Sequence, residues 1–191
     1  VDHTTGFVLQ LIDGDNYSVS GSAIVPDPEY SGPLTVGIRV QDLAGANSAV
    51  FNAVVSVTAV NDPPSITQQN PNPFVTNEDT NLVLSLSNFT VSDVDHSSGF
   101  ILQLIDGDNY SVSGTTVVPD LNYFGPLTVG VRVQDPGVAV SATFNALVTV
   151  TAVNDPPTIL GQVQNPFVTN EDTNLTLNIS NFTISDVDHT T

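Results

Sequence analysis

The sequence predicts an all-β chain made of tandem antiparallel β-sandwich repeats of 93 residues. Two observations predict it: the 191-residue chain repeats itself at an offset of 93, and apolar residues alternate with polar ones as in half-buried strands. No segment carries the apolar stripe, with a period of roughly 3.6 residues, that marks an amphipathic helix. About seven strands per repeat, separated by turns, indicate a sandwich of the immunoglobulin-like kind.

The repeat is close to exact and needs no gap. The letters NDPP occur at 61–64 and again at 154–157, and each residue from 1 to 98 matches the one 93 positions later at 70 of 98 positions. Such similarity suggests a recent duplication within a longer array. Both ends of the chain read VDHTT, so we expect a window of two repeats.

Three segments carry the clearest strand signals. Apolar and polar residues alternate over 127–134 and 142–152, and leucines at 82, 84 and 86 mark a third strand. The turn cluster DGDN at 106–109 separates apolar runs at 100–105 and 110–118, which predicts a β-hairpin.

The double proline Pro63-Pro64 marks the predicted domain boundary. Proline cannot donate to a strand ladder, and it stiffens a connection toward an extended form. We therefore predict that residues 1–62 are the C-terminal two-thirds of one repeat, 63–155 a complete repeat, and 156–191 the N-terminal strands of the next.

The charge balance limits the classes of partner. Twenty acidic residues face two basic ones, giving a formal net charge of −18, whereas nucleic acids and anionic membranes need a basic footprint. No apolar run is long enough to insert into a membrane. There is no cysteine and no lysine, and the three histidines occupy the same position in successive repeats, about one domain apart. We therefore predict that the chain is not an enzyme.

Several motifs together carry a family resemblance. They are TAVNDPPSI at 58–66, TNEDT at 76–80, SDVD at 92–95, VPDPEY at 25–30 and RVQD at 39–42. In this order and spacing the chain resembles cadherin-like tandem repeats of large bacterial, adhesin-type surface proteins. The resemblance implies a seven-stranded sandwich, end-to-end stacking of neighbouring copies, Ca²⁺ at the junctions, and an extracellular or cell-surface location.

The resemblance also implies two sets of Ca²⁺ ligands. At the junction near Asn154 they are Glu78, Asp120, Asn154, Asp155, Asp186 and Asp188. At the junction near Asn61 they are Asp27, Glu29, Asn61, Asp62, Asp93, Asp95 and Asp135. The sequence departs from the family at Ala59 and Ala152, where cadherins place an Asp, and at Pro63 and Pro156, where they place an Asn. Fewer ions per junction are therefore expected.

The residue types in these sets are also ones that supply the oxygen ligands of Ca²⁺. The ion takes six to eight oxygen ligands, and extracellular modules bind it at roughly 10⁻⁴ to 10⁻³ M. Asp93 and Asp95 place two carboxylates on one side of an extended loop, and Asp62 adds another from the linker. The alternative is that Asp and Asn are simply good turn residues. His3, His96 and His189 are expected to be exposed loop residues, with a supporting or transition-metal role as the alternative.

The predicted function is an extracellular structural repeat that forms a Ca²⁺-rigidified rod or filament. Residues 1–62 lack the first strands of a repeat, and residues 156–191 are strands of that kind. Residues 156–191 of one copy, its tail, could therefore complete residues 1–62 of another copy, its head, by strand complementation. Equally, the window could be the repeating unit of one very long chain. The alternative function is a carbohydrate-binding or cell-adhesion module of a secreted polysaccharide-acting protein, with cell-surface glycans as partner; the absence of Trp argues against it.

Overall fold

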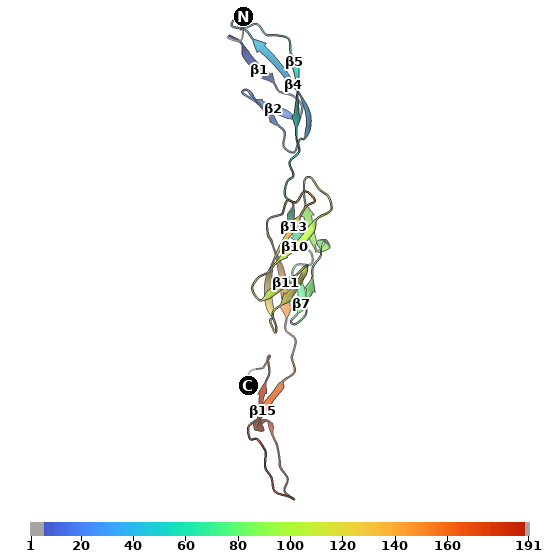
Figure 1. Cartoon of the computed structure of the whole chain (residues 1–191), viewed down its shortest axis with the longest axis vertical. Coiled ribbons are helices and arrows are strands. Elements are labelled where there is room, and N and C mark those ends of the chain that lie inside the picture. The colour runs from blue at the N-terminus through green and yellow to red at the C-terminus, as the bar shows by residue number, and fades with distance from the viewer. Residues whose placement is uncertain (1–5, 190–191) are drawn as a thin grey trace. The chain divides into compact units, whose positions relative to one another are not determined.

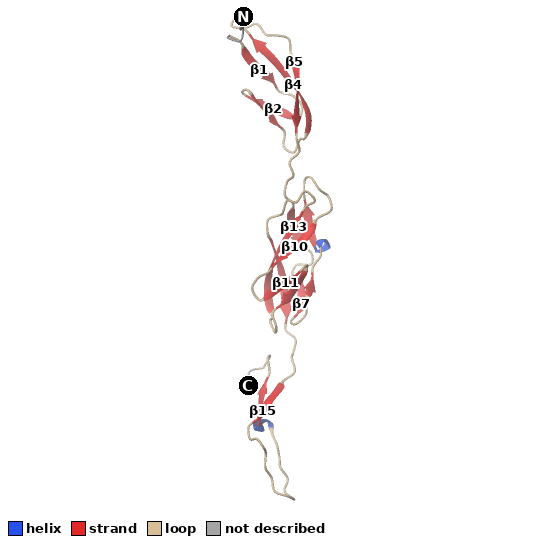
Figure 2. Cartoon of the chain, viewed as in Figure 1, coloured by secondary structure: helices blue, strands red, loops and turns tan. Residues whose placement is uncertain are grey.

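The structure is a computed structural model that describes residues 6–189, and it divides into two compact units, 1–62 and 63–191. Each unit is built from short β-strands, and the helices in the described range are two single turns of 3-10 helix (Figures 1 and 2). Neither turn is long and apolar enough to cross a membrane. The predicted all-β fold class is confirmed; the division into three repeat segments stays a prediction.

The first unit contains five strands in two sheets. They are β1 (Val8–Ile12), β2 (Tyr17–Ser20), β3 (Ala23–Pro26), β4 (Gly32–Gln41) and β5 (Phe51–Val57). One sheet has the order β1-β4-β5 and the other pairs β2 with β3, all antiparallel. Its buried core is small, consisting of Tyr17, Leu34 and Val36.

The second unit contains the complete sandwich. Its elements are β6 (Ser65–Gln69), β7 (Phe74–Asn77), β8 (Leu82–Val83), η1 (Leu86–Asn88), β9 (Phe89–Ser92), β10 (Ile101–Ile105), β11 (Tyr110–Ser113), β12 (Thr116–Pro119), β13 (Gly125–Gln134) and β14 (Phe144–Thr151). A four-stranded sheet β10-β13-β14-β7 faces a second layer formed by β11-β12-β8 and β6-β9. Only the β14–β7 pair is parallel among these ladders.

The alternation in the sequence explains how the sandwich packs. In β13 the residues Leu127, Val129, Val131 and Val133 all face the core and are at most 3% exposed, because successive side chains of a strand point to opposite faces. Phe89 from β9 and Val117 from β12 close the core from the other layer. The rings of Phe74 and Phe89 meet edge to face, with centroids 5.8 Å apart.

Two local predictions are corrected. The DGDN segment does not close a hairpin, because β10 pairs with β13 and β11 pairs with β12. The chain crosses between sheets there, and the Tyr110 hydroxyl anchors the crossing by donating to the carbonyl oxygens of Ile105 (3.0 Å) and Thr128 (3.2 Å). The strand predicted over 82–86 ends at Val83, since Leu86 begins η1.

The chain continues into β15 (Thr158–Gln162), η2 (Ile179–Asn181) and β16 (Phe182–Ser185), with β15 and β16 antiparallel. These elements repeat β6, η1 and β9. The letters FVTN form β7 at 74–77, where β14 lies beside them, yet the same letters at 167–170 form no strand. A strand therefore forms there only where its partner is present.

The side chain of Gln69, at the end of β6, joins that strand to β14 in the opposite sheet. Its buried amide accepts from the N–H of Leu147 (2.7 Å) and donates to the Leu147 carbonyl (3.0 Å). Gln69→Ala is expected to lower the free energy of unfolding of the complete repeat by about 2–4 kcal/mol, because the bonds to Leu147 and a further bond to the Pro71 carbonyl (3.2 Å) are lost and these backbone groups are left without them. Urea unfolding measures the effect.

The control is Gln162→Ala, one period later, where the side chain bonds only to Gln164 and Asn165 in its own loop. Equal losses of stability in the two variants at dilute concentration would contradict this account of Gln69.

Candidate metal centre

One predicted ligand set is divided between the two units, and the other lies within the second unit. Asp27, Glu29, Asn61 and Asp62 belong to the first unit, whereas Asp93, Asp95 and Asp135 belong to the second. Asp27 begins a turn in which its carbonyl accepts from Tyr30 N–H, and Glu29 has a left-handed backbone (φ 60°). The set near Asn154 lies wholly within the second unit, so its geometry can be followed in full.

Glu78 ties the opening strand to the linker. It follows β7, its side chain is buried, and its Oε1 accepts from the N–H of Val153. Its own N–H donates to the carbonyl of Thr151 (2.9 Å), the last residue of β14. The carboxyl group of Glu78 is thus held beside the linker by the parallel pairing of β7 with β14.

Asp155 and Asp188 meet across the linker. The N–H of Asp155 donates to Oδ2 of Asp188 (2.5 Å), which lies in the loop after β16. Oδ2 of Asp155 is buried and has no hydrogen-bond partner. Burial raises the pKa of Asp155, and the nearby carboxylates of Asp188, Asp79, Glu78 and Asp186 raise it further. Four other carboxylates therefore lie near enough to Asp155 to disfavour its charged form.

Asp79 also acts on Asp155, and the sequence offers it as a residue that shares the role of Glu78. Its Oδ1 accepts from the N–H of Asn122 (3.0 Å). Asp120, which the predicted ligand set included, is exposed and closes a turn in which its carbonyl accepts from Tyr123 N–H. The tandem acids of the TNEDT motif were the available signal for Asp79.

Asp186 is held in its charged form by the loop around it. Its Oδ1 accepts from the N–H groups of Asp188 (3.0 Å) and His189 (3.1 Å) and lies 3.5 Å from Nδ1 of His189. Desolvation opposes the charge, but these hydrogen bonds and the imidazole together lower the pKa of Asp186.

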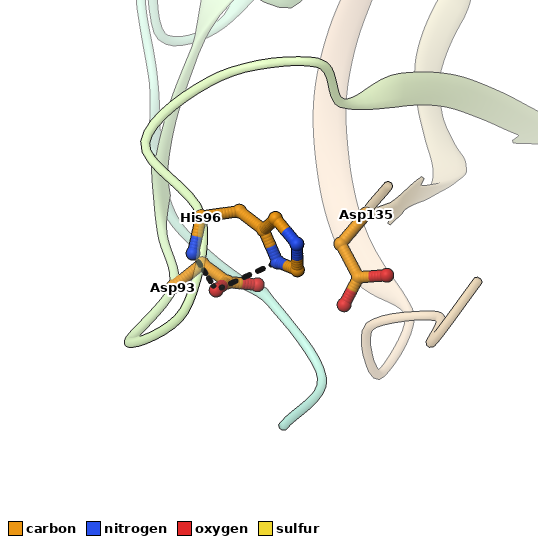
Figure 3. Close-up of side chains that lie close together, drawn as sticks. All are labelled: Asp93, His96 and Asp135. Atoms are coloured by element: carbon orange, nitrogen blue, oxygen red, sulfur yellow. Dashed lines mark hydrogen bonds and ion pairs between the residues drawn. The ribbon is translucent and has the colours of Figure 1, made fainter. Parts of the chain in front are cut away.

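A second cluster lies at the other end of the complete repeat. Asp93, His96 and Asp135 offer ligand atoms that all lie within 4.8 Å of one another, and among residues 6–189 no other such group of three is found. Figure 3 shows the imidazole of His96 between the two carboxylates. Asp135 is buried, and its Oδ1 also accepts from Ala139 N–H (2.9 Å) within the β13–β14 loop.

The expectation of exposed histidines is correct at one site and wrong at another. The side chain of His189 is 71% exposed, whereas that of His96 is 27% exposed with its Nδ1 buried. Asp135 lies beside His96, whereas in residues 6–189 no such third residue is found beside Asp186 and His189. His3 lies outside the described residues.

The acidic cluster around Asp155 fits a divalent cation. Oδ2 of Asp155 is unpartnered, and the carboxylates of Asp188 and Asp186, which are hard ligands of the kind that Ca²⁺ takes, lie near enough to raise the pKa of Asp155. In residues 6–189 these side chains do not bring three ligand oxygens within 4.8 Å of one another, so a bound ion would have to draw them together. A surface hollow of about 360 Å³ adjoins the cluster, lined by Asn154, Asp188 and the linker residues before them. An ion can thus enter from solvent, and its positive charge would offset the negative charge of the carboxylates.

The raised pKa of Asp155 predicts a pH effect in the metal-free chain. Between the ordinary Asp pKa of 3.8 and the raised pKa of Asp155, the native state binds more protons than the unfolded state. Stability is therefore expected to fall as pH rises through that window. Urea unfolding in chelator from about pH 3.5 to 7 measures it, with Asp155→Asn as the comparison.

Asp155→Asn is expected to remove this loss and to be the more stable protein above the window. A constant difference in stability between the two proteins at every pH would contradict it.

No protein-family model matches the chain, and no curated protein matches it. Solved structures do resemble it. It is 14% identical to Drosophila N-cadherin EC1-3, covering 82% of this chain and 58% of that one with a TM-score of 0.32. It is 18% identical to human CDH23 EC21-23, covering 95% of this chain and 68% of that one with a TM-score of 0.37.

An endo-fucoidan hydrolase of glycoside hydrolase family 107 is also similar. The identity is 14%, the coverage is 85% of this chain and 25% of that one, and the TM-score is 0.29. The likenesses are low in identity and in TM-score. We therefore base the proposed function on the chain's own contacts.

Proposed function

We propose that the chain is an extracellular structural repeat whose junctions bind Ca²⁺ and thereby stiffen an array of sandwiches, as an extender or a fibre. One observation supports the proposal: Oδ2 of Asp155 is buried and unpartnered, and the negative charges of Asp188, Asp79, Glu78 and Asp186 raise the pKa of Asp155. Such crowding is unfavourable without a cation.

The contacts around this cluster come from both sides of the linker. Glu78 is fixed to the end of the complete repeat, Asp155 stands in the linker, and Asp188 lies in the loop that follows β16. An ion bound by these carboxylates would join all three segments at one point. Movement of the linker would then require an oxygen to leave the ion, so bound Ca²⁺ would restrict the linker.

Small-angle scattering of the 191-residue chain tests this function. With Ca²⁺ we expect a narrower distribution of dimensions than in chelator, because the linker samples fewer conformations. Asp155→Asn in Ca²⁺ is expected to resemble the wild type in chelator. Identical profiles for the wild type with and without Ca²⁺ would overturn the stiffening role.

We also propose how neighbouring copies of the chain associate. Residues of the first unit are exposed where their equivalents 93 positions later are covered. Leu9 is 54% exposed whereas Leu102 is 9%, and Val40 is 39% exposed whereas Val133 is fully buried. Phe51 is 69% exposed, whereas its equivalent Phe144 packs on the core and its ring meets Phe89.

The tail carries the matching surface. Leu177 is 45% exposed although its equivalent Leu84 is 2% exposed within the core. The rings of Phe167 and Phe182 already meet edge to face at 5.9 Å, as Phe74 and Phe89 do at 5.8 Å. Residues 156–189 thus hold part of the arrangement that 63–96 have in the complete repeat.

The tail of one copy would therefore dock on the head of another in the register that 63–98 adopt on 99–155. The segment at 167–170 would pair with β5 as β7 pairs with β14. In a longer chain the neighbouring repeat would supply the same strands. Both cases bury the same apolar residues and build the same array.

A further inference from the structure

We propose that strand β10 is a lateral docking edge, at which a second copy of this chain pairs antiparallel through the same five residues. β10 lies at one end of the sheet β10-β13-β14-β7, so one side of it has no neighbouring strand among residues 6–189. Docking of the tail concerns the opposite end of the sheet, where β7 lies beside β14. The edge at β10 therefore stays open in a complete array, and an open strand edge is a template for another chain.

The backbone of β10 offers hydrogen-bonding groups on its open side. Val133, which stands opposite Leu102, directs its N–H (3.0 Å) and its carbonyl (2.9 Å) away from β10, to Ser141. Residues that face each other in an antiparallel ladder exchange either both backbone bonds or neither. Leu102 therefore points its N–H and carbonyl to the open side, and Leu104, two residues further on, does the same.

The sequence of this edge is complementary to itself. Residues 101–105 read ILQLI, which is the same in both directions. When two copies pair antiparallel about Gln103, Leu102 of each copy stands opposite Leu104 of the other. Each leucine pair can then exchange both backbone hydrogen bonds, because these are the residues whose groups face outward. The contact is the same for both copies, as the interface of a two-fold symmetric dimer requires.

The side chains on the outer face of the sheet also match in this register. Ile101 is 56% exposed, and Gln103 and Ile105 are half-buried. Pairing would place Ile101 of each copy against Ile105 of the other, with the two Gln103 amides between them. Asp106 would stand opposite Phe100, so no like charges are brought directly opposite each other.

This edge lacks the features that usually prevent pairing. Edge strands are commonly protected by charged residues, by proline or by being very short. Residues 100–105 contain no charge and no proline, although the chain has a net charge of −18. β7, at the other end of the sheet, has four residues, with Pro73 before it and Glu78 and Asp79 after it. Self-association is therefore favoured at β10 over β7.

The first unit repeats the same edge. Its strand β1, Val8–Ile12, reads VLQLI and ends the sheet β1-β4-β5. Val40, opposite Leu9, bonds to Ser48 through its N–H (3.1 Å) and its carbonyl (2.9 Å), so Leu9 also faces the open side. One strand pair is a small and therefore weak contact. An array would carry one such edge per repeat, and many weak contacts together would hold two arrays side by side.

Cysteine cross-linking tests the register, because the chain contains no cysteine. Each variant of the 191-residue chain also carries Phe167→Ala, which weakens docking of the tail. In Gln103→Cys the two facing Cα atoms would stand about 4.5 Å apart, within the range of about 4.4–6.8 Å that a disulfide spans. We expect mild oxidation to give a linked dimer, seen by non-reducing electrophoresis and lost on reduction.

Ile101→Cys is the matched control, on the same strand and the same face. In the proposed register the two copies of residue 101 stand roughly 13–14 Å apart, which is too far for a disulfide. We therefore expect this variant to lose the cross-link although the position is exposed. Mixing Ile101→Cys with Ile105→Cys should restore a linked dimer that contains one chain of each kind, as mass spectrometry of the linked peptides would show.

Two results would overturn the proposal. One is a Gln103→Cys variant that forms no more dimer than Ile101→Cys. The other is an Ile101→Cys variant that dimerises as readily alone as with Ile105→Cys, since that is random collision. Neither result depends on Ca²⁺ or on the tail, so the outcome is independent of the proposed function.

Discussion

Phe74→Ala is expected to destabilise the complete repeat by about 3–5 kcal/mol, whereas Phe167→Ala, the same change one period later, is expected to leave that unfolding transition unchanged. Phe74 is 3% exposed and packs edge to face on Phe89. Phe167 is only half-buried and meets the ring of Phe182 edge to face, within a segment that lacks its sheet partner.

Phe167→Ala should instead weaken association between chains. If the tail docks in the register of the complete repeat, Phe167 fills in the second molecule the place that Phe74 fills in the first. The same 3–5 kcal/mol then appears in the binding free energy, which corresponds to a loss of affinity on the order of 10²–10³-fold. Sedimentation velocity over a concentration series measures it.

Two results would contradict strand complementation between copies. One is a wild-type chain that sediments as a monomer at every concentration. The other is association that Phe167→Ala leaves intact. Phe74→Ala serves as the control, because it measures the free energy that burial of this ring contributes within a single molecule.

Removing the charge of Glu78 is expected to abolish stabilisation by Ca²⁺. With a dissociation constant of roughly 10⁻⁴ to 10⁻³ M, about 10 mM Ca²⁺ stabilises the native state by about 1.4–2.7 kcal/mol per ion. For a domain of this size that raises Tm by about 5–20 °C. Glu78→Gln keeps a similar shape and an acceptor for Val153 N–H but lowers the charge of the cluster.

Thermal unfolding with Ca²⁺ and with chelator measures this effect. Glu171→Gln is the matched control, because Glu171 occupies the same repeat position in an exposed segment. The control should keep the full Ca²⁺-dependent rise in Tm. An equal rise in the Glu78→Gln variant would show that Glu78 is no part of the site.

The sequence was sufficient for much of the sandwich. Alternation over 127–134 predicted β13 correctly, because a period of two places every second residue on the core face. It could not predict which copy of FVTN becomes a strand, since both copies have the same local preference and only 74–77 have β14 beside them. Nor could it place Leu86 in η1, where the capping residues Ser85 and Asn88 determine the turn.

The candidate site, like the fold, was predictable from the sequence only in part. The resemblance placed Glu78, Asp155 and Asp188 in one ligand set. In the structure Glu78 accepts from Val153 N–H, Asp188 accepts from Asp155 N–H, and both carboxylates raise the pKa of Asp155, while their role as ligands stays a prediction. His96 and His189 have the same preceding letters, SDVD, so no local signal separates the partly buried one from the exposed one. The difference comes from the loop that carries Asp135, which is 39 residues further along the chain than His96.

Calorimetric titration of Ca²⁺ into the wild type and Asp155→Asn is the most direct measurement of the central claim. The control is Asp108→Asn, which makes the same charge change at an exposed turn residue outside the cluster. The wild type and the control are expected to bind Ca²⁺ saturably at roughly 10⁻⁴ to 10⁻³ M, and Asp155→Asn is expected to lose at least one bound ion. Equal affinity and stoichiometry in all three proteins would contradict a Ca²⁺ junction at Asp155.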